Sequence, residues 1–256
     1  MNLLLLEPHE VGADGKVRLT GRRADHLRKV LRVEAGRQLR IGVLDRGAGV
    51  GVVEAVEGDE VWLLVEAVDE PPSTPSVDLV VALPRPQALH RLLQWTATMG
   101  VGRLDLVNAW RVEKSFFSSP SVFPESLRKH LLIGAEQGRQ TRLPEVHVQK
   151  LLVPFLESLG SETDGRPCRR LLAHPGVSCQ IEEAWEEGPA ERIHLAIGPE
   201  GGWIDREVQT FSEAGFQPVS LGPWILRVET AIAAALAQIE LLQRGRISSP
   251  PATGAC

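Results

Sequence analysis

The chain of 256 residues carries a net charge of −5, is 43% hydrophobic and 24% charged, and contains three cysteines. This composition is close to the globular average and excludes a disordered or fibrous protein. The apolar runs at 3–6 and 231–237 are far shorter than the roughly 20 residues that a membrane span needs. Because neither a signal-peptide pattern nor a paired-cysteine motif is present, we expect a cytoplasmic protein with no membrane partner and no metal.

Lysine and arginine are unevenly distributed along the chain. Residues 1–40 hold nine of them against five acidic residues, and residues 85–150 hold ten against five. A globally acidic protein can bind nucleic acid if its positive charge gathers on one face. The composition therefore permits an RNA partner, although ordinary solvated faces would give the same pattern.

Short β elements are predicted over residues 1–70. The segments 17–19, 38–43, 49–56 and 61–68 are rich in β-forming residues, and glycine or charged turns separate them. One helix is predicted over 24–33, where Leu27, Val30 and Leu31 fall at helical spacing. These elements indicate a small barrel-like domain. The Pro/Ser stretch 71–76 that follows indicates a linker.

Strands and helices alternate after the linker, which indicates an α/β domain over residues 77–245. Strands are predicted at 77–83, 104–107, 171–174, 193–197 and 218–221, and their apolar character suits a buried parallel sheet. Helices are predicted at 88–99, 124–136, 205–214 and 229–243. Asp205 is expected to cap its helix and Gly215 to stop it. Residues 246–256 are expected to form a flexible tail.

Several common catalytic motifs are missing from the sequence. The chain contains no GxxxxGK[ST], no GxGxxG after a strand, no HExxH and no GxSxG. Its seven histidines show no metal-ligand spacing. The sequence therefore does not support a P-loop enzyme, a nucleotide-dependent oxidoreductase or a zinc enzyme.

Two glycine-bearing turns each follow a predicted strand. They are Ile197-Gly198-Pro199-Glu200-Gly201-Gly202-Trp203 and Leu221-Gly222-Pro223-Trp224-Ile225-Leu226-Arg227-Val228-Glu229-Thr230-Ala231. In open α/β sheets ligands bind beyond the carboxyl ends of strands, where glycine lets backbone N–H groups approach them. We expect one crevice there, with Arg227 and Glu229 at its mouth. Each turn alone could instead be a tight turn without a ligand, and Thr230 could be a plain N-cap.

Four segments together resemble the RsmE family, which are SPOUT-superfamily methyltransferases that make 3-methyluridine in 16S ribosomal RNA. Two of them are the glycine-bearing turns. The third is Gly134-Ala135-Glu136-Gln137-Gly138-Arg139 with Pro144 after it, which resembles the AAEQxxR…P segment of the family. The fourth is His26-Leu27-Arg28-Lys29-Val30-Leu31-Arg32 with Gly36 after it, which resembles HxxxVLR…G. The match covers almost the whole chain in the right order.

The resemblance implies an architecture that periodicity cannot reveal. It implies a PUA-like β-barrel for RNA, an α/β domain with a trefoil knot, a homodimer, and S-adenosylmethionine held by the knot loops. Knots are rare among folds. Carried over to this chain, the cofactor-binding residues would be Leu172, His174, Gly198, Pro199, Glu200, Gly201, Gly202, Leu221, Gly222, Ile225 and Leu226. The partner would be 16S ribosomal RNA or the small ribosomal subunit.

Methyl transfer to uridine N3 requires that the N3 proton leaves. We expect Arg227 to hold negative charge, and Glu200 or Glu229 to accept the proton or to orient the base. Glu136 and Gln137 could shape the same site, or Glu136 could be an ordinary surface carboxylate. The residues expected to contact RNA are Arg22, Arg23, Arg28, Lys29, Arg32, Glu136, Gln137 and Arg139. Contacts of arginine and lysine with phosphates position RNA without specifying its sequence.

One segment departs from the family pattern. Relatives usually carry QKxxELG where this chain has Gln94-Trp95-Thr96-Ala97-Thr98-Met99-Gly100, so Trp95 replaces the lysine and Met99 the glutamate. Apolar packing in place of an ion pair would explain the exchange, since such replacements are often neutral. Alternatively, the chain is a diverged relative that binds RNA without this activity or methylates a different uridine.

Overall fold

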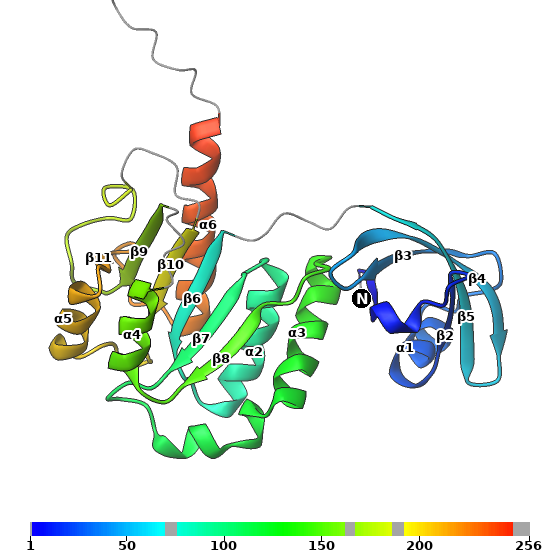
Figure 1. Ribbon diagram of the computed structural model, residues 1–256, viewed down its shortest axis with the longest axis horizontal. Coiled ribbons are helices and arrows are strands. Elements are labelled where there is room, and N and C mark those ends of the chain that lie inside the picture. The colour runs from blue at the N-terminus through cyan, green and yellow to red at the C-terminus, as the bar shows by residue number, and fades with distance from the viewer. Residues whose placement is uncertain (1, 70–75, 162–166, 186–191, 248–256) are drawn as a thin grey trace, which may run out of the picture. The chain divides into compact units, whose positions relative to one another are not determined.

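The computed structural model describes residues 2–69, 76–161, 167–185 and 192–247 (Figure 1). The predicted linker, apart from Ser76, and the predicted tail from residue 248 onward lie outside these ranges. The described residues fall into two compact units. The first unit combines the described part of Met1–Pro75 with Leu93–Gly102 and Glu125–Pro144, and the second unit holds the rest.

The first unit contains a five-stranded sheet in the order β1-β3-β4-β5-β2. Its strands are β1 (Leu4–Leu6), β2 (Lys16–Leu19), β3 (Gln38–Val43), β4 (Gly47–Glu57) and β5 (Glu60–Val68). β1 pairs with β3 in parallel and the other pairs are antiparallel. The four predicted strands are confirmed. β1 is the apolar run at the start of the chain, for which the sequence reading had assigned no strand.

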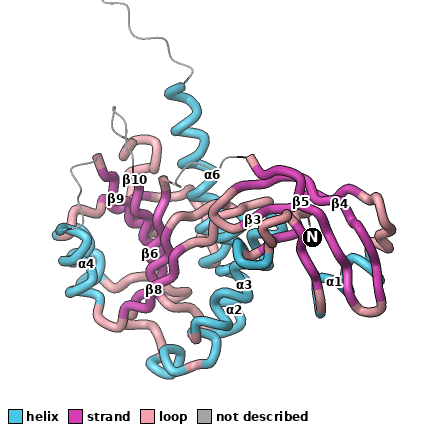
Figure 2. The backbone as a smooth tube through the Cα atoms, turned by 45° about the vertical axis from the view of Figure 1, so that its right-hand side comes forward, coloured by secondary structure: helices cyan, strands magenta, loops and turns pink. Residues whose placement is uncertain are grey.

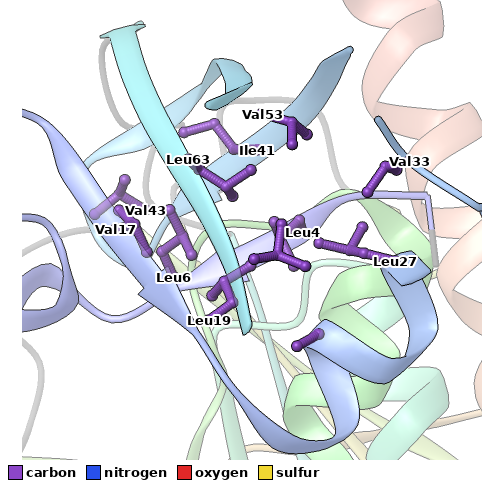
Figure 3. Close-up of a cluster of buried hydrophobic side chains, with 12 residues drawn as sticks. Leu4, Leu6, Val17, Leu19, Leu27, Val33, Ile41, Val43, Val53 and Leu63 are labelled. Carbon is purple, nitrogen blue, oxygen red and sulfur yellow. The ribbon is translucent and has the colours of Figure 1, made fainter. Parts of the chain in front are cut away.

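The inner side of this sheet encloses a core of aliphatic side chains (Figure 3). In β2, Val17 and Leu19 are buried while Lys16 and Arg18 are exposed, because successive strand residues face opposite sides. Two register shifts between β4 and β5 bend the sheet, as β-bulges do. The sheet therefore curls around its own aliphatic core.

The helix predicted over 24–33 begins and ends three residues earlier than expected. α1 (Gly21–Asp25) passes directly into a single π-helical turn at His26–Val30. Ala24 and Leu27 are buried in the core, whereas Val30 and Leu31 are exposed. The helix cannot continue beyond Leu31 because Arg32 has a positive φ of 49°.

Two helices meet within the first unit at the ends of α2 (Pro86–Thr98) and α3 (Pro124–Gly138). A Cβ added to Gly134 would lie 2.2 Å from the carbonyl oxygen of Gln94, and one added to Gly138 would lie 2.3 Å from that of Thr98. The Thr98 hydroxyl donates to the carbonyl oxygens of Gln94 at 2.8 Å and Gly134 at 2.9 Å. Glycine at these two positions therefore lets the two backbones touch.

The second unit contains a six-stranded, wholly parallel sheet in the order β11-β9-β10-β6-β7-β8 (Figure 2). Its strands are β6 (Val77–Ala82), β7 (Arg103–Val107), β8 (Glu145–Gln149), β9 (Cys168–Ala173), β10 (Arg192–Ile197) and β11 (Gln217–Val219). The central strands are almost entirely buried, as a parallel sheet requires. This confirms the predicted α/β class. β8 is an addition to the predicted strands.

Three further helices belong to the second unit: α4 (Leu152–Ser161), α5 (Asp205–Glu213), which packs against β11, and α6 (Val228–Ile247), which packs against β10. The expectation that Asp205 caps α5 is wrong, because Asp205 is the first helical residue and Ile204 occupies the cap position. The carboxylate of Glu207 accepts hydrogen bonds from the backbone N–H groups of Ile204 at 3.0 Å and Trp110 at 2.7 Å. Gly215, with φ +82°, ends α5 as predicted.

Buried charges lie across strands of the second sheet. Asp78 of β6 and His194 of β10 are paired in register, and the Nε of Arg192 lies 2.5 Å from Asp78 Oδ2. Burial, together with Arg192, Arg170 and Arg103, lowers the pKa of His194 to about 3. The His194 imidazole is therefore neutral at physiological pH.

Candidate active site

A cavity of about 90 Å³ opens at the carboxyl ends of β9, β10 and β11 in the second unit. Three chain segments and the first turn of α6 form its walls. The lining residues are Ala173, His174, Pro175, Ile197, Gly198, Pro199, Glu200, Gly202, Trp203, Leu221, Gly222, Trp224, Ile225, Leu226, Val228 and Ala231. The two glycine-bearing turns therefore do meet in one crevice.

The first turn connects β10 to α5 and is held in shape by its glycines. A Cβ on Gly198 would lie 3.1 Å from Trp203 Nε1. Gly202 has φ +74°, and its N–H donates to the carbonyl of Pro199 at 2.7 Å. Arg111 donates from Nη1 to the carbonyl of Gly201, and the side chain of Trp203 is buried beside Phe211, with ring centroids 4.8 Å apart. This packing fixes the turn on the cavity side.

The second turn connects β11 to α6. Gly222 has φ +127°, which other residues rarely adopt. The turn carries two exposed apolar side chains at the cavity rim, Trp224 at 77% and Ile225 at 88% exposure. α6 begins at Val228, so Thr230 is its third residue and the expectation of a plain N-cap there is wrong. The carbonyl of Arg227 accepts from the N–H of Ala231 at 2.8 Å, which puts Arg227 at the entry of the helix.

The cavity walls are mainly apolar and leave a few polar atoms without partners. His174 Nδ1 and Trp203 Nε1 are buried and make no hydrogen bond to any described residue. Leaving a buried polar atom unpaired costs about 1–3 kcal/mol, so each such atom needs an explanation. Apolar walls with a few convergent polar groups are typical of small-molecule sites. The cavity therefore has the character of a ligand site.

The carboxylates expected to take part in catalysis each lie near an arginine of the same unit. Arg85 Nε is 3.8 Å from Glu200 Oε1, and Arg91 Nη2 is 3.6 Å from Glu229 Oε1. Glu200 lines the cavity, whereas Arg227 and Glu229 flank it without lining it. Arg227 is exposed and Glu229 half-buried. The sequence pattern did not predict either arginine as a partner of these carboxylates.

Nine of the residues expected to bind a cofactor line the cavity, and two do not. Leu172 is fully buried within β9, and Gly201 is exposed beside Arg111. Seven lining residues were not among those expected to bind a cofactor: Ala173, Pro175, Ile197, Trp203, Trp224, Val228 and Ala231. Five of these seven lie in the two glycine-bearing turns, which was the available signal.

Most of the residues expected to contact RNA lie in the first unit and already have partners there. Arg23 donates to the carbonyl of Leu5 at 2.9 Å and pairs with Glu10. Burial is the largest single influence on the Glu10 carboxyl and raises its pKa, but the hydrogen bonds with Arg23 and with the Glu7 backbone and the charge of Arg23 together outweigh burial. The Glu10 pKa therefore lies below its ordinary value. Arg23 thus has a structural ion pair.

The other cations expected to contact RNA differ in whether they have an ion-pair partner. Arg28 Nη1 lies 2.9 Å from Asp59 Oδ1, and Lys29 Nζ lies 2.8 Å from Asp25 Oδ1. Arg32 and Arg139 are exposed and have no ion-pair partner among the described residues. Both have positive φ, 49° and 58°.

Glu136 is not an ordinary surface carboxylate. Its side chain is buried and lies 3.2 Å from Arg22 Nη2, and its carbonyl accepts from the N–H groups of Asn2 and Leu3. Gln137, beside it, is exposed. Trp95 and Met99 are 46% and 37% exposed, so each side chain is only partly covered.

In the ranges given above, no group of three or more histidine, cysteine or acidic residues could hold a metal ion. No helix there is long and apolar enough to cross a membrane.

A family model described as an RNA methyltransferase domain matches residues 71–240. The Ribosomal RNA small subunit methyltransferase E of Synechocystis sp. is 31% identical over 242 residues, which cover 93% of this chain and 77% of that protein. The match thus extends over both units.

Two solved structures share the fold over almost the whole chain. Ribosomal RNA small subunit methyltransferase E from Neisseria gonorrhoeae, bound to S-adenosylmethionine, has a TM-score of 0.77 at 24% identity and covers 94% of this chain and 98% of that one. A protein from Legionella pneumophila in complex with bound S-adenosylmethionine has a TM-score of 0.72 at 25% identity, covering 95% and 97%.

Proposed function

Because this chain belongs to the ribosomal RNA small subunit methyltransferase E family, we propose that it transfers a methyl group from S-adenosylmethionine to N3 of a uridine in 16S ribosomal RNA. The observation that carries the proposal is the cavity at the carboxyl ends of β9, β10 and β11, with its apolar walls and two unpaired buried nitrogens.

The residues of this cavity fit S-adenosylmethionine. Ile197, Leu221 and Leu226 offer apolar surface for an adenine ring and a methionine chain. His174 Nδ1 can donate or accept a hydrogen bond, depending on the tautomer, and Trp203 Nε1 can donate one. Backbone groups of the two glycine-bearing turns would hold the polar parts, since glycine lets a ligand approach closely. Most of the binding free energy would come from burial.

When bound, S-adenosylmethionine supplies a methyl carbon that is already electrophilic. The protein must therefore mainly orient the uridine so that its N3 faces that carbon in line. As the bond from N3 to carbon forms, the carbon–sulfur bond breaks and its electron pair stays on sulfur. The N3 proton must move to a base, and negative charge must be stabilised on the uracil while this happens.

Three side chains around the cavity suit these tasks. Arg227, at the entry of α6, would stabilise negative charge on the uracil or a phosphate, because the helix start adds electropositive N–H groups. Glu200 or Glu229 would accept the N3 proton or orient the base. Glu200 lines the cavity, and we favour it as the acceptor. Arg85 and Arg91 would balance the charge of the two carboxylates.

We further propose the finer features of the family for this chain. The five-stranded sheet of the first unit would be a PUA-like RNA-binding barrel, and the second unit a SPOUT domain whose last segments form a trefoil knot. A parallel bridge joins Gln180 to Ser220, just beyond the end of β11. It supports the proposal because it places the segment after β9 beside the segment that leads into α6. Residues 1–70, 77–245 and 246–256 would be barrel, catalytic domain and tail, joined by the linker 71–76.

We also propose a homodimer in the cytoplasm, where ribosomal RNA is its partner. Exposed Trp224 and Ile225 supply apolar surface that a second copy could cover. Arg32 and Arg139 form no ion pair with any described residue, so they are the predicted RNA contacts that are most available to a phosphate. The Arg22 side chain is also exposed, although it is paired with Glu136. Arg28 and Lys29 would have to exchange an acidic partner for phosphate.

A second candidate function rests on the exposed Trp95 and Met99. Because both side chains face solvent, the departure from the family pattern alters a surface that could meet RNA. A relative that methylates another uridine, or binds RNA without methylating it, would also keep both cavity turns.

Mass spectrometry of nucleosides from 16S ribosomal RNA tests the proposal. Cells lacking the gene should lose 3-methyluridine, and the wild-type gene should restore it. Arg227→Ala should fail to restore it, whereas the matched variant Arg206→Ala, at an exposed arginine of α5, should succeed. Persistence of 3-methyluridine in cells lacking the gene would favour the second candidate.

A further inference from the structure

A groove of about 520 Å³ lies in the first unit and is separate from the cavity residues. It runs along the second half of α2 and the last turns of α3, and Arg22 and His26 complete it. All of its lining residues belong to the first unit. Gly134, where the two helices touch, is among its lining residues.

The groove presents an aromatic ring to solvent. Trp95 lines it and is 46% exposed, and the partly buried Ile133 lies on the α3 side. An indole is among the side chains that gain most from being covered, and its flat face suits another ring. Met99, directly after the last residue of α2, is exposed as well. The chain is therefore apolar at two exposed positions here, whereas solvent-facing positions are normally polar.

Polar side chains line the groove together with Trp95. The Arg22 side chain is 65% exposed although its guanidinium is anchored on buried Glu136, so some of its donors remain free for a ligand. The Gln94 amide lines the groove and contacts His130 Nδ1 at 3.2 Å, and the Gln137 amide is exposed. Arg139, two residues beyond Gln137, is exposed without an ion-pair partner among the described residues.

We propose that this groove binds one unpaired base of the RNA substrate, with the base stacked on Trp95. Unpaired RNA bases stack on aromatic side chains, and amide groups read their hydrogen-bonding edges. Gln94 and Gln137 supply such amides, while Arg22 and Arg139 supply positive charge for the flanking phosphates. Of the possible occupants, an RNA base is the one that uses the ring, the amides and the cations together. The inference rests on the proposed RNA substrate.

The test is binding of a fluorescein-labelled, single-stranded 12-nucleotide RNA, measured by fluorescence anisotropy with the full-length protein. Stacking of one base contributes about 1–3 kcal/mol, so Trp95→Leu should weaken binding about 5- to 150-fold. Trp95→Phe keeps an aromatic face and should stay within about threefold of wild type. Trp110→Leu changes a tryptophan that is 80% exposed in the second unit and should leave the affinity unchanged.

Abasic probes sharpen the experiment. In these probes the base is removed from one position of the RNA at a time. At the stacked position, its removal should weaken binding to wild type but should not further weaken binding to Trp95→Leu. The proposal is overturned if Trp95→Leu binds the RNA like wild type, or if Trp95→Phe is as weak as Trp95→Leu. It is also overturned if Trp95→Leu impairs binding to the small subunit alone and not to naked RNA, because a protein partner would then occupy the groove.

This outcome is distinguishable from failure of the proposed function. Calorimetry with S-adenosylmethionine should give the same affinity for Trp95→Leu and wild type, since the cavity contains no groove residue. If wild type makes no 3-methyluridine yet binds RNA through Trp95, the proposed reaction is wrong and the proposal that the groove binds an RNA base is supported. If wild type makes 3-methyluridine, and the Trp95→Leu variant has the same RNA affinity and the same KM for RNA as wild type, only the proposal about the groove is wrong.

Discussion

Glycine serves different purposes in the two units. In the first unit, Gly134 and Gly138 leave no space for a side chain, since a Cβ at either would collide with the backbone of α2. In the second unit, Gly202 and Gly222 have positive φ and border a cavity, with at most a distant side chain near the Cβ position. Glycine thus lets two helices touch in the first unit, and in the second unit it forms turns that border a cavity.

Arginine shows a parallel contrast. In the first unit Arg22 and Arg23 anchor buried or half-buried carboxylates, so these residues contribute to the structure. In the second unit, Arg227 is exposed beside a cavity. Arginine therefore supports carboxylates inside the first unit, whereas Arg227 of the second unit keeps an exposed side chain.

The largest effect is expected at Arg227. Arg227→Ala should lower kcat for RNA methylation about 10²- to 10³-fold, because groups that stabilise developing charge contribute that much. Affinity for S-adenosylmethionine should stay unchanged, since Arg227 does not line the cavity. Steady-state kinetics and calorimetry measure the two quantities. Wild-type kcat in this variant would remove Arg227 from the mechanism.

Gly134→Ala tests the packing role of glycine in the first unit. The added Cβ would meet Gln94 at 2.2 Å, so the helices must separate, and such overpacking costs about 1–3 kcal/mol of unfolding free energy. Urea denaturation measures the loss. Gln137→Ala, an exposed change three residues along the same helix, should alter stability by less than about 0.5 kcal/mol. Equal stabilities for the two variants would contradict the tight contact.

As the pH falls, the second unit should lose folding stability at a higher pH than the first unit. The His194 pKa of about 3 lies below its ordinary 6.5, so the unfolded chain takes up a proton first as the pH falls below 6.5. This destabilises the folded state by about 2 kcal/mol at pH 5. Glu10 in the first unit has a lowered pKa, so its stabilising effect is lost only as the pH falls below about 4.5.

Urea denaturation between pH 8 and pH 5 checks the His194 expectation. His194→Gln should show a flatter dependence on pH, whatever its stability at pH 8. His147→Gln changes a half-exposed histidine on β8 and should keep the wild-type dependence. An unchanged slope in His194→Gln would mean that another group controls acid sensitivity.

Gly202→Ala is expected to have the smallest effect of the set. Holding alanine at φ +74° costs roughly 1–2 kcal/mol, which would distort the turn and weaken S-adenosylmethionine binding about tenfold. Gly58→Ala carries the same kind of backbone strain, at φ +54° in the β4–β5 hairpin of the first unit, and should leave that affinity intact. Similar losses in both variants would show that general destabilisation is responsible.

The sequence predicted the regular parts of the fold well because burial and periodicity are local signals. Continuous apolar runs predicted β6 and β10, and alternation predicted β2. It missed β8, an edge strand in which Glu145, His147 and Gln149 interrupt the apolar pattern. It also missed α4, whose Pro154 suggests a break but lies in the first helical turn, where no N–H is needed.

The candidate site was predictable only in part. Strand ends followed by glycine predicted the crevice, and the family resemblance supplied the cofactor. The burial of Glu136 was not predictable, because its partner Arg22 is 114 residues away in the sequence. The unpaired nitrogens of His174 and Trp203 depend on which groups surround them in three dimensions. The exposure of Trp95 likewise follows from packing rather than from local sequence.

The most direct test of the central claim is methyl transfer by the purified protein. Isotope-labelled S-adenosylmethionine would be incubated with 16S ribosomal RNA or small subunits from cells lacking the gene, and the labelled nucleoside identified by mass spectrometry. We expect label in 3-methyluridine for wild type and a loss of about 10²-fold or more for Arg227→Ala. Label in another nucleoside, or no transfer to either substrate by wild type, would contradict the claim.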